Sequence, residues 1–206
     1  MNKKKIEFFF DVGSPASYLA WTQIKAIAER HNAELEMKPM LLGAVFQATG
    51  NSSPATVPAK GNYTRQDFQR FARRYGVTLN HNPFFPINTL QLMRGAAAYQ
   101  ETEHFGRYLS AVFTAMWVEE KDMGKPEIVA EVLKRNGFEP AEVMHLIADP
   151  DVKDRLRQTT EEAIARGVLG APSIFVGDEL FFGQDRLDFV ERALAGEDRV
   201  TPPAER

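Results

Sequence analysis

The residues whose types and spacing could do chemistry are Ser14 and Pro15, which follow a short apolar run and Gly13. Serine is a favoured N-cap and proline is favoured at the first helical position, so a helix is predicted to begin at Pro15. The unpaired N–H groups and the positive dipole end of such a helix favour an anion, and they lower the pKa of a thiol. Ser14 would then donate a hydrogen bond to a thiolate sulfur, although it could equally be a plain helix cap.

The sequence of 206 residues contains no cysteine. This excludes disulfides, thiolate metal sites and dithiol redox chemistry within the chain. Any thiol that reacts near Ser14 must therefore arrive on a bound molecule. The four histidines are scattered without the spacing of a metal-binding motif, so no metal site is predicted.

The charge and hydropathy of the sequence argue against several classes of protein. The formal net charge is −3 and the isoelectric point is near 5.9, whereas proteins that bind nucleic acids usually present a dominant basic surface. The apolar run near the N-terminus is interrupted by Glu7 and ended by Asp11, which makes it too short for a secretory signal. No stretch approaches the roughly 20 apolar residues of a membrane-spanning helix. We therefore expect a cytoplasmic protein without nucleic-acid or membrane partners.

Apolar periodicity predicts a β-α-β opening for the chain. Residues 6–11 form an apolar, aromatic run that is typical of a buried strand, and residues 35–40 alternate apolar and charged side chains as a second strand does. Between them, apolar residues recur at spacings of three and four from about residue 15 to residue 30, which indicates a helix.

The middle of the chain changes character. Residues 43–88 are punctuated by glycine and proline, and we expect them to be loop-rich around one amphipathic helix. A helical block follows, and strand signals return on either side of a Gly177-Asp178 turn before a last helix. The predicted helices are residues 64–75, 89–100, 105–116, 126–135, 140–147, 150–166 and 187–194, and the later strands are 172–176 and 180–182.

This order of elements predicts an α/β protein with a thioredoxin-like fold that is interrupted by a large helical insertion. Residues 1–42 and 167–196 would form one discontinuous thioredoxin-like domain. Residues 43–166 would form the loop-rich and helical insertion. The remaining residues, 197–206, are polar and are expected to form a tail.

Four segments of the sequence also resemble motifs of one family, the 2-hydroxychromene-2-carboxylate isomerases and kappa-class glutathione transferases of the DsbA-like thioredoxin superfamily. The segments are DVGSPASYL at 11–19; Gly50-Asn51 with VPAKGNY at 57–63; FFPINTL at 84–90; and GVLGAPS at 167–173 with FGQDR at 182–186. The matches keep the family order over almost the whole chain. Redox members of the superfamily carry Cys-Pro-x-Cys where this sequence has Ser-Pro-Ala-Ser at 14–17.

The resemblance implies that glutathione is the bound thiol and that Ser14 holds its sulfur. It also implies a cis peptide bond before Pro172, which would expose the backbone of Ala171 to the cysteinyl peptide of glutathione. Polar side chains would contact the rest of the tripeptide. The implied contacts are Asn51, Lys60, Gln184 and Asp185, although Lys60 could be a solvated surface charge and Asp185 a plain N-cap.

The same resemblance implies a small aromatic acid as substrate. Asn82, Phe84 and Asn88 are the candidate contacts, with turn formation as the alternative for both asparagines. A basic stretch that runs from Lys60 through Arg65 to Arg74 could attract the acid or be a solvated helix face. Trp117 is expected to belong to the core.

The implied reaction is glutathione-dependent isomerisation of 2-hydroxychromene-2-carboxylate, or a related intermediate of aromatic degradation such as that of naphthalene, to trans-o-hydroxybenzylidenepyruvate. Glutathione would act as a catalytic nucleophile. A kappa-type transferase or peroxidase that consumes glutathione is one alternative, and a non-catalytic thioredoxin-like binding module is another. The resemblance further implies a homodimer.

Overall fold

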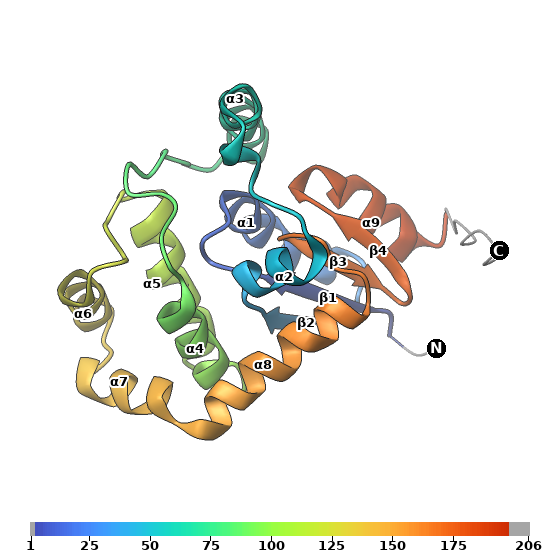
Figure 1. The fold of residues 1–206 in the computed structure, drawn as a ribbon. Coiled ribbons are helices and arrows are strands. Elements are labelled where there is room, and N and C mark those ends of the chain that lie inside the picture. Colours follow the sequence, from blue (N-terminus) through green and yellow to red (C-terminus); the bar gives the residue numbers. More distant parts are fainter. Residues whose placement is uncertain (1–2, 198–206) are drawn as a thin grey trace.

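The computed structural model describes residues 3–197, and its centre is a four-stranded sheet (Figure 1). The strand order is β2-β1-β3-β4. Strands β1 and β2 run parallel, whereas β3 is antiparallel to both β1 and β4. The strands are β1 (Lys5–Phe10), β2 (Glu34–Pro39), β3 (Ser173–Val176) and β4 (Glu179–Phe182). The predicted β-α-β opening and the late β-β hairpin are therefore confirmed.

Strand β1 carries a core on each of its two faces, because successive side chains of a strand point to opposite sides. Ile6, Phe8 and Phe10 belong to the larger core, which includes side chains of the long helices. Phe9 belongs to a second, smaller core. Burial on both faces explains why this strand is nearly continuous in apolar residues, interrupted only by Glu7.

Helices cover both sides of the sheet. On one side lie α1 (Pro15–Arg30), α3 (Pro58–Tyr75) and α9 (Leu187–Ala195), where α1 contacts the other two. On the other side α8 (Pro150–Ala165) contacts β2 and packs against α2 (Leu42–Thr49). Figure 1 shows α8 crossing beneath β1 and β2 as one long helix. The sheet is thus enclosed between helical layers, as the thioredoxin-like fold predicts.

The helical block forms beside the sheet. Helix α4 contacts α5, α7 and α8, so these helices share the larger core rather than forming a separate one. The close approach of α4 and α5 depends on Gly95, because a Cβ there would lie 2.0 Å from the Tyr108 hydroxyl. The helices are α4 (Leu90–Tyr99), α5 (Phe105–Trp117), α6 (Pro126–Arg135) and α7 (Pro140–Ala148).

The expectation of an irregular stretch over residues 43–88 is wrong for its first half. Helix α2 forms at Leu42–Thr49 and ends at Gly50 in a left-handed conformation, and a 3₁₀ turn, η1, follows at Pro54–Thr56. Helix α3 begins at Pro58 rather than at residue 64. Pro58 occupies the first turn of the helix, where the missing N–H costs nothing, so it starts the helix instead of breaking it.

Other expectations about the chain as a whole have different outcomes. The predicted tail, residues 197–206, lies outside the described residues except for Glu197. Across residues 3–197, no helix is both long and apolar enough to cross a membrane. The division of the chain into a discontinuous domain and an insertion stays a prediction.

Candidate active site

Ser14 caps helix α1 at the point where β1 passes into the helix. Its Oγ accepts a hydrogen bond from the Ser17 N–H at 3.1 Å and donates to the Ala171 carbonyl oxygen at 2.9 Å. Of the two serines in the Ser-Pro-Ala-Ser motif, Ser14 lines the cavity described below, whereas Ser17 is fully buried and its Oγ has no partner among residues 3–197. The serine available to a ligand is therefore Ser14.

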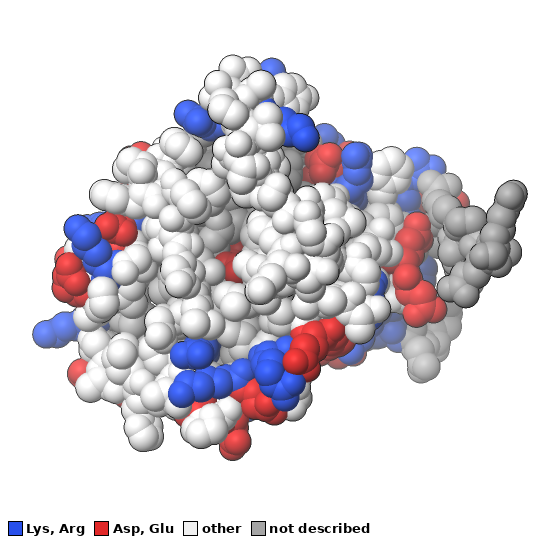
Figure 2. Space-filling model, viewed as in Figure 1, with Lys and Arg blue, Asp and Glu red and all other residues white. Residues whose placement is uncertain are grey.

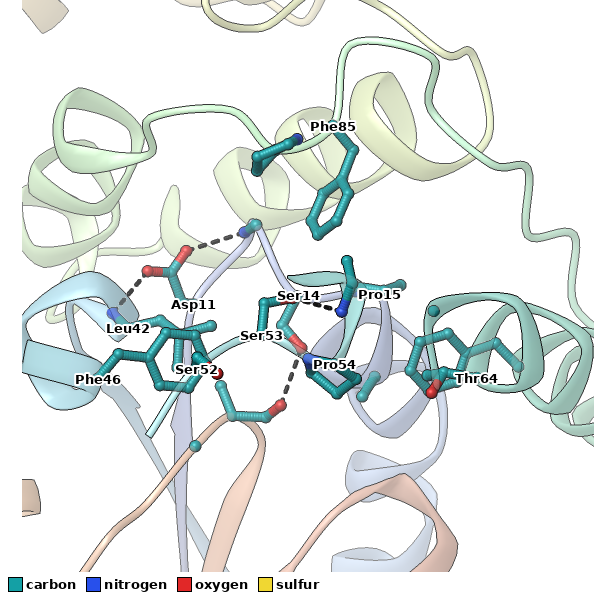
Figure 3. A pocket seen from close by; sticks show the side chains of 18 of the residues that line it. Asp11, Ser14, Pro15, Leu42, Phe46, Ser52, Ser53, Pro54, Thr64 and Phe85 are labelled. Atoms are coloured by element: carbon teal, nitrogen blue, oxygen red, sulfur yellow. Dashed lines mark hydrogen bonds between the residues drawn. The ribbon is translucent and has the colours of Figure 1, made fainter. Parts of the chain in front are cut away.

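The loop before β3 lies directly against this helix start (Figure 3). The Ala171–Pro172 peptide bond is cis, as the resemblance implies. The Pro172 carbonyl accepts from the Gly183 N–H at 3.0 Å, which ties the loop to the end of β4. Within the described part of the chain, no group accepts from the Ala171 N–H. A backbone donor thus stands beside the Ser14 hydroxyl.

Asp11 is a buried carboxylate that the sequence reasoning missed as a site residue. Its Oδ1 accepts from the Gly13 N–H at 2.9 Å, and its Oδ2 accepts from the Leu42 N–H at 2.9 Å and from the Thr89 hydroxyl at 3.1 Å. Figure 3 shows Asp11 beside the loop that leads to Ser14. Burial raises the pKa of Asp11 above its ordinary value, and the three hydrogen bonds oppose this only in part.

A large open cavity surrounds Ser14. Its volume is about 1300 Å³, which exceeds the roughly 300–1,000 Å³ of common ligand pockets and leaves room for two small molecules. The molecular face in Figure 2 is largely uncharged in the middle, with charged residues at its edges and over α8. Side chains on its walls include Ser14, Asn51, Lys60, Arg65, Phe68, His81, Phe85, Asn88, Gln184 and Asp185.

The structure places the residues predicted to contact glutathione around this cavity, except Pro172, which does not line it. Asn51 and Lys60 line it, as do Gln184 and Asp185 of the 3₁₀ turn η2 (Gln184–Arg186). The Asn51 side-chain amide donates to the Leu169 carbonyl at 2.8 Å, which holds the cis-proline loop from the outside. Lys60 is exposed and forms no ion pair within residues 3–197. A free cation therefore faces the cavity.

Asp185 and Gln184 are positioned by their neighbours. Asp185 lies 3.4 Å from the Arg186 guanidinium. Gly183 has a φ of 106°, and a Cβ there would lie 2.4 Å from the Asp185 Oδ1, so the turn requires glycine. The Tyr75 hydroxyl donates to the Gln184 carbonyl at 2.7 Å and links the turn to α3.

The three predicted substrate contacts have different surroundings in the structure, and the predictions for Asn82 and Phe84 need correction. Asn82 is fully buried: its amide donates to the Met116 and Lys121 carbonyls at 2.9 Å, and its Oδ1 accepts from the Phe84 N–H at 2.9 Å. It does not line the cavity, and neither does the exposed Phe84. Asn88 does line it, with its Oδ1 accepting from the Leu90 N–H.

Two neighbouring aromatic residues do line the cavity. Phe85, not Phe84, lines the cavity and packs against Trp117, with ring centroids 5.9 Å apart. Trp117 is buried as expected, although it reaches the cavity wall, and its Nε1 donates to the Val12 carbonyl at 2.8 Å. The cis Phe85–Pro86 bond turns the chain here. Adjacent phenylalanines in a proline-rich loop carry no signal that tells which one faces inward.

Metal binding is not supported by any cluster in the part of the chain that the structure describes. Within residues 3–197, no three His, Cys, Asp or Glu side chains are grouped so as to hold an ion. The groups that the structure places at the site are a helix N-terminus, a serine hydroxyl, an unpaired backbone N–H and a few charged side chains. These groups can bind and orient an anionic thiol and a second small molecule.

Comparisons with known proteins agree with this arrangement. Residues 5–195 match the family model of the DSBA-like thioredoxin domain. The chain is 31% identical to the 2-hydroxychromene-2-carboxylate isomerase of Pseudomonas putida over 92% of this chain and 93% of that protein. It is 25% identical to glutathione S-transferase kappa 1 of Rattus norvegicus over 92% and 90%. A solved 2-hydroxychromene-2-carboxylate isomerase superposes with a TM-score of 0.83 at 28% identity, covering 93% of this chain and 95% of that one.

Proposed function

Since this chain belongs to the DSBA-like thioredoxin domain family, beside its 2-hydroxychromene-2-carboxylate isomerases and kappa glutathione transferases, we propose that it is a glutathione-dependent isomerase. Its substrate would be 2-hydroxychromene-2-carboxylate or a related intermediate of aromatic degradation, and its product the ring-opened trans-o-hydroxybenzylidenepyruvate. The observation that carries the proposal is Ser14, which caps α1 inside the cavity and contacts the cis-proline loop.

The residues around the cavity fit glutathione as the cofactor. The Ala171 N–H is a free backbone donor for the cysteinyl peptide, and Lys60 is a free cation for a carboxylate. Asp185 can accept from the γ-glutamyl ammonium. In the structure the Ser14 hydroxyl donates to the Ala171 carbonyl. To bind glutathione it would rotate and donate to the sulfur instead.

In this mechanism the helix N-terminus and Ser14 stabilise an anion at one point of the cavity, which lowers the pKa of a thiol placed there. Ser14, Ala171, Lys60 and Asp185 would hold glutathione with its sulfur at the helix N-terminus, where it would supply a thiolate nucleophile for reversible addition to the unsaturated substrate. Ser14 keeps its Oγ as acceptor for the Ser17 N–H throughout, so its hydroxyl proton can point only toward the cavity or the loop.

The decisive experiment follows the absorbance of 2-hydroxychromene-2-carboxylate with thoroughly dialysed protein, with and without added glutathione. We expect turnover to require glutathione and to fall about 10- to 100-fold in Ser14→Ala, since a hydrogen bond to a charged group is worth roughly 1.5–3 kcal/mol. Ser110→Ala, on the exposed face of α5, is the matched control and should turn over normally. Full activity without glutathione would overturn the proposal.

The kappa-type transferase remains the second candidate, because kappa glutathione transferases are among the relatives of similar length. A transferase or peroxidase consumes glutathione in proportion to product, whereas an isomerase leaves its total concentration unchanged. Measuring free thiol during turnover separates the two. A non-catalytic binding module would show no turnover with either substrate class.

We further propose that the protein works in the cytoplasm as a homodimer. Single large apolar side chains are exposed on three helices, Tyr63 on α3, Met144 on α7 and Phe189 on α9, and each is a surface that a second copy of the chain could cover. Analytical ultracentrifugation of the full chain would test this, with a monomeric mass at micromolar concentration as the contrary result.

A further inference from the structure

We propose that Arg65 and His81 form a subsite that binds the carboxylate of the aromatic substrate, on the α3 side of the cavity. The identity of that substrate rests on the function proposed above. The first support is that Arg65 lines the cavity and pairs with no carboxylate within residues 3–197. By contrast, Arg70 and Arg74 of the same helix do not line the cavity, and they pair with Asp67 at 3.1 Å and Asp188 at 2.8 Å. Arg65 therefore combines a guanidinium without a carboxylate partner in residues 3–197 with a place on the cavity wall.

His81 supplies the second group. His81 lines the same cavity as Arg65, and it lies two residues after Leu79, whose carbonyl is bound by Gln69 one turn along α3 from Arg65. Burial lowers the pKa of His81, and the positive charge of Arg65 lowers it further. The negative charge of Glu120 raises the pKa of His81, but Glu120 does not line the cavity. An anion placed between Arg65 and His81 would therefore meet a permanent positive charge and an imidazole that can donate a hydrogen bond.

The backbone that carries His81 is held firmly on two sides. One turn after Arg65, the Gln69 amide donates to the Leu79 carbonyl at 2.7 Å, which ties this segment to α3. The Asn80 N–H donates to the Trp117 carbonyl at 2.7 Å, and its side-chain amide donates to the Val118 carbonyl at 2.6 Å. These bonds hold the backbone just before His81 against α3 and the end of α5, so this segment keeps His81 on the same side of the cavity as Arg65.

The residues that line the cavity beside Arg65 and His81 indicate the shape and polarity of the rest of the ligand. Phe68 and Phe85 line the same cavity and offer flat apolar surface, and Figure 3 shows the Phe85 ring projecting toward the Ser14 loop. The Nε1 of Trp117 is already bound to the Val12 carbonyl and is unavailable to a ligand. A flat, conjugated body with one carboxylate matches these groups. Glutathione also carries carboxylates, so the test must show whether Arg65 binds the carboxylate of the substrate or one of glutathione.

The test compares 2-hydroxycinnamate with 2-hydroxycinnamamide, which differ by one charge, in titration calorimetry with the full chain. The wild type should bind the carboxylate about tenfold more tightly than the amide, and Arg65→Gln should abolish this preference without weakening the amide. Arg73→Gln is the matched control on α3, because Arg73 does not line the cavity, and it should keep the preference.

Three results would overturn the subsite. They are an equal affinity of the wild type for both probes, a preference that persists in Arg65→Gln, and an Arg65→Gln variant that loses affinity for glutathione alone. The last result would assign Arg65 to glutathione instead of the substrate. Turnover without glutathione would contradict the proposed function but would leave the probe preference intact, so the two failures are distinguishable.

Discussion

Two carboxylates of one short segment, Glu7 in β1 and Asp11 just after it, have opposite surroundings. Glu7 contacts Arg166 at 2.8 Å and Lys38 at 3.3 Å, whereas Asp11 accepts hydrogen bonds only from neutral donors. Burial alone would raise the pKa of both residues. The two cations outweigh burial at Glu7 and hold its pKa below the ordinary value, while the pKa of Asp11 is raised.

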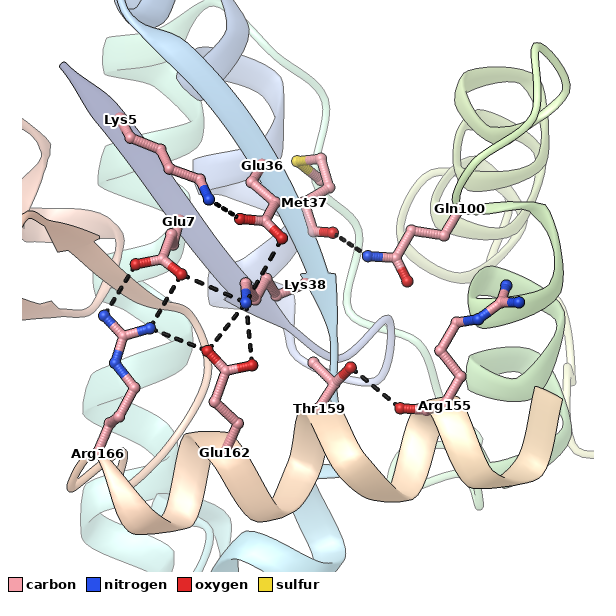
Figure 4. A network of polar contacts seen from close by, with 10 residues as sticks. All are labelled: Lys5, Glu7, Glu36, Met37, Lys38, Gln100, Arg155, Thr159, Glu162 and Arg166. Carbon is pink, nitrogen blue, oxygen red and sulfur yellow. Dashed lines mark hydrogen bonds and ion pairs between the residues drawn. The ribbon is translucent and has the colours of Figure 1, made fainter. Parts of the chain in front are cut away.

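The ion network around Glu7 joins the sheet to α8 (Figure 4). Lys38 also contacts Glu162 of α8 at 2.9 Å, and the Arg166 guanidinium lies 3.8 Å from the centre of the Phe175 ring. Asp11 lies instead among three segments that border the cavity, through Gly13, Leu42 and Thr89. The comparison teaches that charge pairing secures the far side of the sheet, whereas one unpaired carboxylate positions the backbone around Ser14.

The largest expected effect comes from Asp11→Ala. It would leave buried donors of Gly13, Leu42 and Thr89 without an acceptor, which should lower the free energy of unfolding by about 3 kcal/mol. The corresponding fall in Tm is roughly 6–12 °C for a chain of this size. Thermal and urea denaturation would measure it. Asp11→Asn keeps one acceptor oxygen and should lose only about 1–2 kcal/mol; equal losses in both variants would contradict this account.

A smaller effect is expected for Glu7→Gln. Lys38 and Arg166 keep Glu162 as a partner, so the loss should be about 1–2 kcal/mol rather than that of a wholly unpaired buried charge. Urea denaturation at neutral pH would measure it. The control is Glu29→Gln, because Glu29 pairs only loosely with Lys25 at 4.0 Å on an exposed helix face and should change stability by less than about 0.5 kcal/mol. A loss at Glu7 no larger than the control would refute the network's role.

The pH dependence of stability should differ in sign between the two carboxylates. The depressed pKa of Glu7 contributes stability above its ordinary value of 4.5, which is lost as pH falls through the folded-state pKa. The raised pKa of Asp11 contributes stability below its ordinary value of 3.8, which is lost as pH rises through the folded-state pKa.

Denaturation of wild type, Glu7→Gln and Asp11→Asn across the acidic range would separate these contributions. The advantage of wild type over Glu7→Gln should shrink as pH falls, and its advantage over Asp11→Asn should shrink as pH rises. Parallel curves for all three proteins would rule out the contrast between the two carboxylates.

Much of the scaffold was predictable, because it depends on local patterns. The strands, the helix after Ser14 and the cis bond before Pro172 follow from periodicity, capping and a motif resemblance. The region around α2 was not predictable in this way. Its short helix has no charged residue to define a polar face, and Pro58 resembles a helix breaker although it begins α3.

The sequence by itself determined the cap at Ser14, the absence of any thiol in the chain and the family, because these depend only on residue types, local spacing and the order of motifs. Only the tertiary structure decided which side chains face the cavity. The buried Asn82 amide donates to carbonyls at the end of α5 and just after it. Phe85, rather than Phe84, lines the cavity. Asp11 accepts hydrogen bonds from Leu42 and Thr89, which are distant in the sequence. These choices depend on contacts between distant segments, and no local pattern records them.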